Sequence, residues 1–198
     1  MTTRRTRVIG IAATLGWLIA VSGSAIVAQG EKPQKPQPLG IGRAATADEI
    51  RVLDIDVMPD GTGLPEGRGT VAEGQATYAT KCASCHGKVG EGKPFDQLVG
   101  REAGSKFDFA TNPKLVKTIG NYWPYATTLF DYTARTMPFA QPGTLSANEV
   151  YGLVAYLLSL NKIVATDAVM DRHSLPKVVM PARDRFVRDN RAGGPRVK

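Results

Sequence analysis

The feature that most constrains this chain is the run Cys82-Ala83-Ser84-Cys85-His86, which contains both cysteines of a 198-residue sequence. Two thiols three positions apart cannot cross-link distant parts of a fold, so the chain is not a disulfide-stapled scaffold. In c-type haem attachment each thiol adds to a vinyl group of the porphyrin, and the next histidine reaches the iron. The sequence therefore predicts one covalent haem c, held by Cys82 and Cys85, with His86 as an axial iron ligand.

Two rival interpretations explain this run less well. A thioredoxin-like redox pair would need a preceding strand and would give His86 no role. A zinc site needs four ligands, and the sequence offers only two cysteines and two histidines. Haem attachment uses all three reactive side chains of the run.

Haem iron also needs a sixth ligand or an open site, and three methionines follow the motif: Met137, Met170 and Met180. Met137 lies 51 residues after His86, which is enough chain to pass the haem edge and return on the opposite face. Met/His ligation is an established cytochrome arrangement, so we expect Met137 to be the sixth ligand. The alternatives are core packing for Met137 and bis-His ligation through His173.

The first 28 residues have the pattern of an export signal. Arg4, Arg5 and Arg7 precede an uncharged run of 21 residues, 8–28, that ends in small side chains. This pattern predicts a signal peptide cut after Ala28 and a periplasmic protein. The alternative is an uncleaved anchor, because about 20 apolar residues can span a bilayer. In that case residues 8–28 would hold the chain in the inner membrane.

Two arms of opposite charge flank the central part of the sequence. Residues 29–69 begin with a proline-containing spacer and are interpreted as a linker and docking arm; residues 39–69 carry six acidic and three basic side chains. Residues 162–198 carry nine basic and four acidic side chains, as either a solvated tail or a clasp over a partner. Because the positive charge belongs to the leader and the tail, we expect no nucleic-acid binding.

Residues 70–161 are expected to form one helical domain. Helices are predicted at 71–81, at Pro113–Ile119, at Ala126–Thr136 and after Ser146, with a single helical turn at 48–53. Ser146 and Glu149 have the spacing of a capping box, which fixes the start of the last helix. No segment shows the alternation of a strand, so the predicted fold class is all-α.

The haem motif, together with Gly74, Tyr78, Met137 and Tyr156, resembles class I cytochrome c. The resemblance implies that the first and last helices of the domain cross at right angles. Gly74 would permit their close approach, and the two tyrosines would fill the crossing. The expected fold is therefore class I cytochrome c with extended N- and C-terminal arms.

A narrower resemblance involves segments that a general cytochrome does not need: Gly42-Arg43, Asp54 to Gly63, Trp123 to Thr128 and Leu175 to Pro181. Together they are similar to the cytochrome subunit of periplasmic sulfite or sulfane-sulfur dehydrogenases (Sox D-type). This resemblance implies a molybdenum-cofactor dehydrogenase subunit as electron donor and a downstream cytochrome or oxidase as acceptor. It also implies an electron-transfer subunit that catalyses no bond making. We expect Trp123 and Tyr125 in the wall of the haem pocket, with ordinary packing as the alternative to a hydrogen bond to a haem propionate.

Two other functions remain open at this point. An open sixth site would make the chain a haem enzyme or a gas sensor. The same haem domain could also serve another periplasmic dehydrogenase, of alcohol or aldehyde type, because the haem motif alone does not identify the donor.

Overall fold

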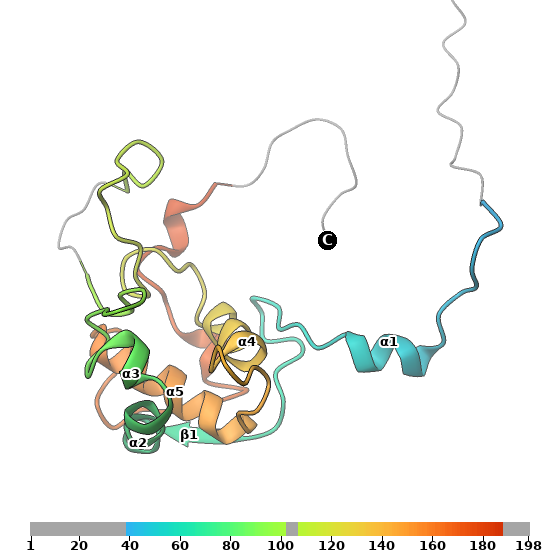
Figure 1. Ribbon diagram of the computed structural model, residues 1–198, viewed down its shortest axis with the longest axis horizontal. Coiled ribbons are helices and arrows are strands. Elements are labelled where there is room, and N and C mark those ends of the chain that lie inside the picture. The colour runs from blue at the N-terminus through green and yellow to red at the C-terminus, as the bar shows by residue number, and fades with distance from the viewer. Residues whose placement is uncertain (1–38, 102–106, 188–198) are drawn as a thin grey trace, which may run out of the picture. The chain divides into compact units, whose positions relative to one another are not determined.

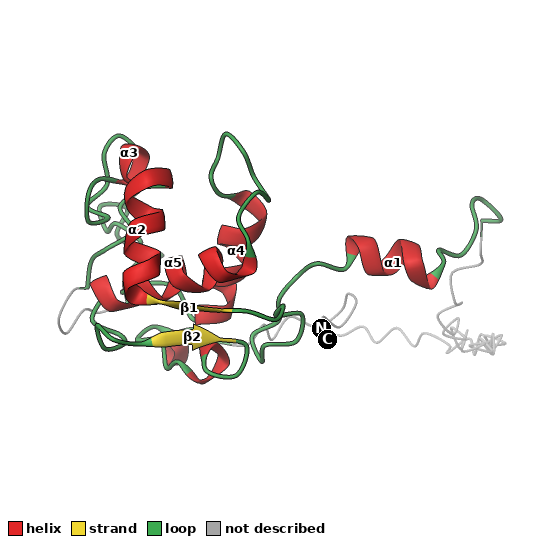
Figure 2. Cartoon of the chain, turned by 90° about the horizontal axis from the view of Figure 1, so that it is seen from below, coloured by secondary structure: helices red, strands yellow, loops and turns green. Residues whose placement is uncertain are grey.

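The computed structural model describes residues 39–101 and 107–187. Its contacts divide the chain into two units, residues 1–44 and 45–198, and of the first only residues 39–44 are described. The predicted leader and the proline-containing spacer lie outside the described residues. Figures 1 and 2 show the elements of the second unit, which are α1 (Ala47–Leu53), β1 (Arg68–Thr70), α2 (Val71–Lys81), α3 (Ala83–His86), α4 (Ala126–Thr136), α5 (Ala147–Leu160), β2 (Val169–Asp171) and the 3-10 turns η1 (Leu175–Lys177) and η2 (Arg183–Arg185).

The crossing of α2 and α5 lies at the centre of the domain. A methyl group added at Gly74 would lie 1.8 Å from the carbonyl oxygen of Gly152, so the two backbones touch. Beyond this contact the rings of Tyr78 and Tyr156 pack with their centroids 5.4 Å apart. α5 is buried along most of its length, and α4 also packs against it. The crossing expected from the resemblance is confirmed, and with it the cytochrome c fold class.

Among the described residues, three helices begin with a complete capping box, in which a hydroxyl and a carboxylate satisfy exposed backbone N–H groups. The pairs are Thr46–Glu49 for α1, Thr70–Glu73 for α2 and Ser146–Glu149 for α5. The predicted helices at 71–81 and 126–136 and the start of α5 match the structure.

A small antiparallel ladder, not predicted from the sequence, joins the two arms. β1 pairs with β2 so that Gly69 lies opposite Met170. A methyl group on Gly69 would lie 2.1 Å from the backbone nitrogen of Gly152, so β1 lies directly on α5. Strands of three residues are too short to show a period of two, so no alternating pattern marks them in the sequence.

The helix predicted at Pro113–Ile119 is wrong, because this segment forms turns and extended chain. The N–H groups that would form helix hydrogen bonds donate instead to nearby side chains and to a backbone carbonyl distant in the sequence. The N–H of Lys114 donates to Asn112 Oδ1 at 3.1 Å, and that of Thr118 to Asn121 Oδ1 at 2.8 Å. The N–H of Ile119 donates to the carbonyl of Leu98 at 3.1 Å. Local side-chain bonds of this kind compete with helix formation.

The hydrophobic core takes in residues from both flanking arms. Leu64 is buried in it, as are Met170, Leu175 and Met180 from the C-terminal side. Both arms therefore contribute to the same core as α2, α4 and α5. In the part of the chain that the structure describes, no helix has the length and apolarity to cross a membrane.

The crossing leads to a first prediction. Gly74→Ala should lower the free energy of unfolding by about 3 kcal/mol, the upper part of the range for overpacking, since a backbone oxygen cannot move aside. Gly152→Ala is the matched control: its methyl group would come no closer than 3.0 Å to Gly74. It should cost about 1 kcal/mol or less, because alanine favours the helix. Urea denaturation measures both, and equal losses would contradict this account of the crossing.

Candidate functional site

The cysteine motif follows directly from the end of α2. Cys82 caps that helix, its N–H donating to the carbonyl of Tyr78 at 2.9 Å. The chain then turns through α3, where the N–H groups of Cys85 and His86 both donate to the carbonyl of Cys82. Both thiols are half-buried and neither is in a disulfide. Burial raises the pKa of the Cys82 thiol to about 11, so it is protonated at neutral pH.

The His86 ring is oriented by a backbone carbonyl. Its Nδ1 lies 2.8 Å from the carbonyl oxygen of Asp96, which can only accept, so Nδ1 carries the proton. The Nε2 atom then keeps its lone pair for a metal. A metal-ligating histidine almost always donates its other N–H to such an acceptor. His86 therefore has the tautomer and the restraint that an iron ligand needs.

The loop that supplies Asp96 is a compact turn folded over α3. The Glu91 carboxylate accepts from the N–H groups of Lys88 and Val89, and these bonds lower the pKa of Glu91. Phe95 N–H donates to the carbonyl of Cys85 at 3.0 Å, which ties the end of the loop to the motif. Asp96 could not be identified from the sequence. It binds His86 through its backbone carbonyl, which any residue could supply.

Tyr78 connects this loop to the helix crossing. Its hydroxyl donates to the carbonyl of Gly87 at 2.9 Å, while its ring packs on Tyr156. Burial raises the pKa of Tyr78, so the hydroxyl keeps its proton and this bond. The turn after His86 is thus held by the same residue that fills the α2–α5 crossing.

The three candidate methionines lie in different environments. Met170 and Met180 are 5% and 1% exposed and belong to the hydrophobic core. Met137 is half-buried and directly follows α4, its N–H donating to the carbonyl of Thr133 at 3.1 Å. α3 and the loop after α4 lie on the same side of the β1–β2 ladder (Figure 2). Of the three, Met137 has a thioether that core packing does not occupy.

His173 is placed away from the haem motif. It follows β2, whose Asp171 pairs with Arg68 of β1, and β1 leads into the N-terminal end of α2. His86 follows the other end of the same 11-residue helix. At 1.5 Å per residue, α2 separates the two ends by about 16 Å.

Trp123 and Tyr125 precede α4. The Trp123 ring packs edge-on against Tyr132 with centroids 5.6 Å apart, and it borders the hydrophobic core. Tyr125 is the N-cap residue of α4, and the guanidinium of Arg183 lies 5.8 Å from its ring centroid. Both rings are therefore attached to the helix that ends at Met137, and the C-terminal arm covers one of them.

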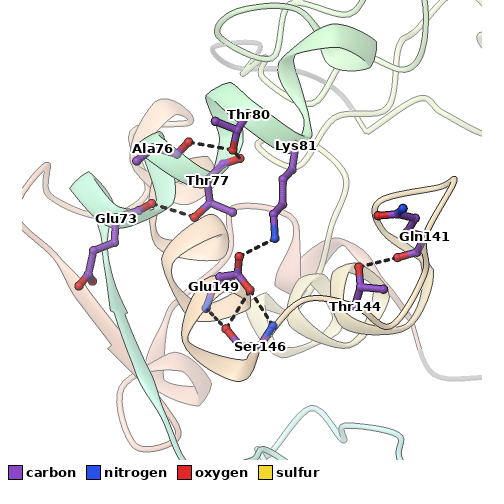
Figure 3. Close-up of polar contacts among 9 residues, drawn as sticks. All are labelled: Glu73, Ala76, Thr77, Thr80, Lys81, Gln141, Thr144, Ser146 and Glu149. Atoms are coloured by element: carbon purple, nitrogen blue, oxygen red, sulfur yellow. Dashed lines mark hydrogen bonds and ion pairs between the residues drawn. The ribbon is translucent and has the colours of Figure 1, made fainter.

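An ion pair links the haem motif to the start of α5 (Figure 3). Lys81, next to Cys82 in the chain, donates to Glu149 Oε1 at 2.6 Å, and the other oxygen of Glu149 accepts from Ser146. The bond from Lys81, followed by those from Ser146, lowers the pKa of Glu149 to about 2. Neither partner was singled out for this role from the sequence, because the pair spans 68 positions.

The residues present fit a covalently attached haem. Two unpaired thiols lie beside a histidine whose free nitrogen is fixed, and of the three methionines after the motif only Met137 lies outside the core. Within residues 39–101 and 107–187, no group of three or more His, Cys, Asp and Glu side chains could hold a metal ion.

Comparisons with known proteins agree with this geometry. Residues 69–157 match the family described as cytochrome C oxidase, cbb3-type, subunit III. A chain in the crystal structure of the sulfane dehydrogenase SoxCD from Paracoccus pantotrophus is 44% identical, with a TM-score of 0.67. That match covers 77% of this chain and 73% of the other. A comparison with curated proteins found no match.

The Lys81–Glu149 pair leads to a prediction about pH. Folding lowers the pKa of Glu149 from its usual 4.5 to about 2, so its stabilising contribution is complete above pH 4.5 and is lost as the pH falls toward 2. Glu149→Gln keeps the capping box and removes the charge. It should lower the free energy of unfolding by about 0.5–1 kcal/mol at pH 7, as expected for an exposed pair.

The control is Glu73→Gln, the same change in the capping box of α2, where Glu73 bonds Thr70. Urea denaturation at pH 7 and pH 2.5 measures both variants. The excess loss of Glu149→Gln should shrink at the lower pH. Equal losses for the two variants at pH 7 would contradict a stabilising role for the cross-helix pair.

Proposed function

Since this chain belongs to the cytochrome c family and is 44% identical to a chain of sulfane dehydrogenase SoxCD, we propose that it is the monohaem electron-transfer subunit of a periplasmic sulfur dehydrogenase. It accepts electrons from a molybdenum-cofactor subunit that oxidises sulfite or sulfane sulfur, and passes them to a downstream cytochrome or oxidase. Residues 1–28 would direct its export as a signal peptide, or residues 8–28 would anchor it to the inner membrane.

The observation that carries this proposal is the extent of the match. It covers 77% of the chain, about 150 residues, whereas the predicted cytochrome domain 70–161 has only 92. The likeness therefore continues into the arms, which a freely diffusing cytochrome does not need. The same observation favours a sulfur dehydrogenase over an alcohol or aldehyde dehydrogenase as the partner.

The chain's own residues have distinct tasks in this proposal. Cys82 and Cys85 would hold haem c through thioether bonds, and His86 and Met137 would bind its iron. When bound, the haem supplies a one-electron couple between ferric and ferrous iron. Asp96 keeps the His86 ring in one orientation, so that little rearrangement accompanies each electron. Trp123 and Tyr125 exclude water from the pocket.

The N-terminal arm offers a surface for the dehydrogenase subunit. None of the seven residues of α1 is buried, and Ile50, Val52 and Leu53 are 53%, 70% and 80% exposed. Isolated helices shorter than about 12 residues are marginal in water, even when well capped. We infer that contact with the dehydrogenase subunit covers these aliphatic side chains and stabilises α1.

Replacing methionines tests the axial ligation. Met137→Leu should abolish the sulfur-to-iron absorption band of the oxidised protein and lower the reduction potential, because leucine cannot bind iron and Met ligation raises the potential. Met180→Leu, the same change in the core, should keep the band and cost less than about 1.5 kcal/mol of stability. Spectroscopy and redox titration of the haem-loaded proteins measure both. A wild-type protein without the band would favour a haem enzyme or sensor with an open sixth site.

Replacing exposed aliphatic residues tests the docking surface. Leu53→Asp should weaken binding to the dehydrogenase subunit about tenfold or more, as expected for a central interface residue, with an unchanged haem spectrum. Val179→Asp is the control, because Val179 is 70% exposed on the C-terminal side. Co-purification from periplasm identifies the partner, and titration measures the affinity. Recovery of a quinoprotein dehydrogenase instead of a molybdenum enzyme would contradict the proposed partner.

A further inference from the structure

Residues 57–65, here called the strap, form a compact turn between α1 and β1. Met58 and Thr62 are joined by a backbone hydrogen bond of 2.9 Å, and the N–H of Leu64 donates to the carbonyl of Gly61 at 3.1 Å. The Leu64 side chain is buried in the core, and Val57 packs against its edge. The strap is therefore part of the folded domain, although it lies in the arm that precedes it.

Two buried side chains of α4 bind the strap. Asp131 Oδ1 accepts from the N–H of Val57 at 3.0 Å, and Thr127 Oγ1 donates to the carbonyl of Pro59 at 3.3 Å. Asp131 and Thr127 are 8% and 1% exposed. Residues four apart lie on one face of a helix, so the strap runs along α4 for a full turn. The other oxygen of Asp131 accepts from Arg135, also on α4.

The strap is itself fixed to the rest of the domain. The Tyr151 hydroxyl of α5 donates to the carbonyl of Pro65 at 2.9 Å. Pro176 of η1 fills the space beside Gly61, where an added methyl group would lie 2.5 Å from Pro176 Cγ. These contacts hold the strap against α5 and η1. The strap in turn contacts the face of α4 that carries Asp131.

α4 in turn positions Met137. Asp131 lies six residues before Met137, and the N–H of Met137 donates to the carbonyl of Thr133 in the last turn of the helix. A displacement of α4 along or away from the strap would therefore move the Met137 backbone with it.

We propose that Asp131 is a positioning residue which, through the strap, holds α4 and hence the Met137 thioether at the iron. This inference rests on the Met137 ligation proposed above. It assigns residues 57–65 to the haem site, although they lie outside the predicted cytochrome domain. Thr127 supports the same contact with a weaker, neutral hydrogen bond.

Displacement of Met137 by added imidazole measures this restraint directly. Imidazole binds ferric iron only when the thioether has left, so its apparent affinity is proportional to the fraction of molecules with an open site. Loosening α4 should raise that fraction. The titration is followed by loss of the sulfur-to-iron band in the haem-loaded, full-length protein.

Four variants separate the strap from general stability. Asp131→Ala should lower the apparent dissociation constant of imidazole about tenfold, and Thr127→Val about threefold, in line with loss of a charged and a neutral hydrogen bond. Arg135→Ala removes the partner of Asp131 within α4 and leaves the bond to Val57. Thr118→Val is the second control: Thr118 is 2% exposed and its hydroxyl donates to the carbonyl of Gly100, so the change removes the same kind of bond as Thr127→Val but away from the strap. Both controls should stay within about twofold of wild type.

The outcomes are distinct. Equal imidazole affinity in all four variants, with the band present in wild type, overturns the role of the strap and leaves Met137 ligation intact. A shift in Arg135→Ala as large as in Asp131→Ala also overturns it, because the ion pair within α4 would then hold Met137. If Asp131→Ala takes up no haem, the contrast between Thr127→Val and Thr118→Val decides whether the strap holds Met137. A wild type without the band refutes the ligation itself.

Discussion

The contact between the backbones of α2 and α5 is the constraint on which the rest of this structure depends. At Gly74 the two helices leave no space for a side chain, because the backbone of Gly152 lies directly opposite, and β1 approaches the same point through Gly69. Tyr78 and Tyr156 fill the volume next to the contact. The crossing fixes the direction in which α2 ends, and the haem motif follows that end without an intervening residue. The packing of α2 in the core therefore sets the position of the haem motif.

The two proposed iron ligands are held by different contacts. His86 is restrained locally by the carbonyl of Asp96, and Tyr78 at the crossing holds the turn that follows it through the carbonyl of Gly87. Met137 is carried by α4, and α4 is braced by Asp131 against residues 57–65. This difference gives the N-terminal arm a structural purpose besides the proposed docking. The N-terminal arm has a buried part that packs on α4 and an exposed part, α1, that is available to a partner.

Much of this arrangement could be predicted from the sequence, because it depends on local signals. α2, α4 and the start of α5 have helical spacing or capping boxes, and the haem motif is contiguous. The segment 113–119 could not, because Asn112 and Asn121 bind the backbone groups that a helix would use. Three other interactions could not be predicted either, because their partners are paired only in the completed fold. They are the bond between His86 and the Asp96 carbonyl, the bond between Val57 and Asp131, and the β1–β2 ladder. The resemblance supplied the crossing at Gly74, but it did not indicate how residues 57–65 are used.

The central claim is that the chain takes single electrons from a sulfur dehydrogenase. Anaerobic titration of the oxidised chain, in excess over its dehydrogenase subunit, with measured amounts of sulfite tests it most directly. Oxidation of one sulfite releases two electrons, so a monohaem carrier should show two chains reduced for each sulfite consumed. A ratio of one would contradict the single haem. Absence of reduction while the dehydrogenase reduces an artificial acceptor would contradict the electron-transfer role.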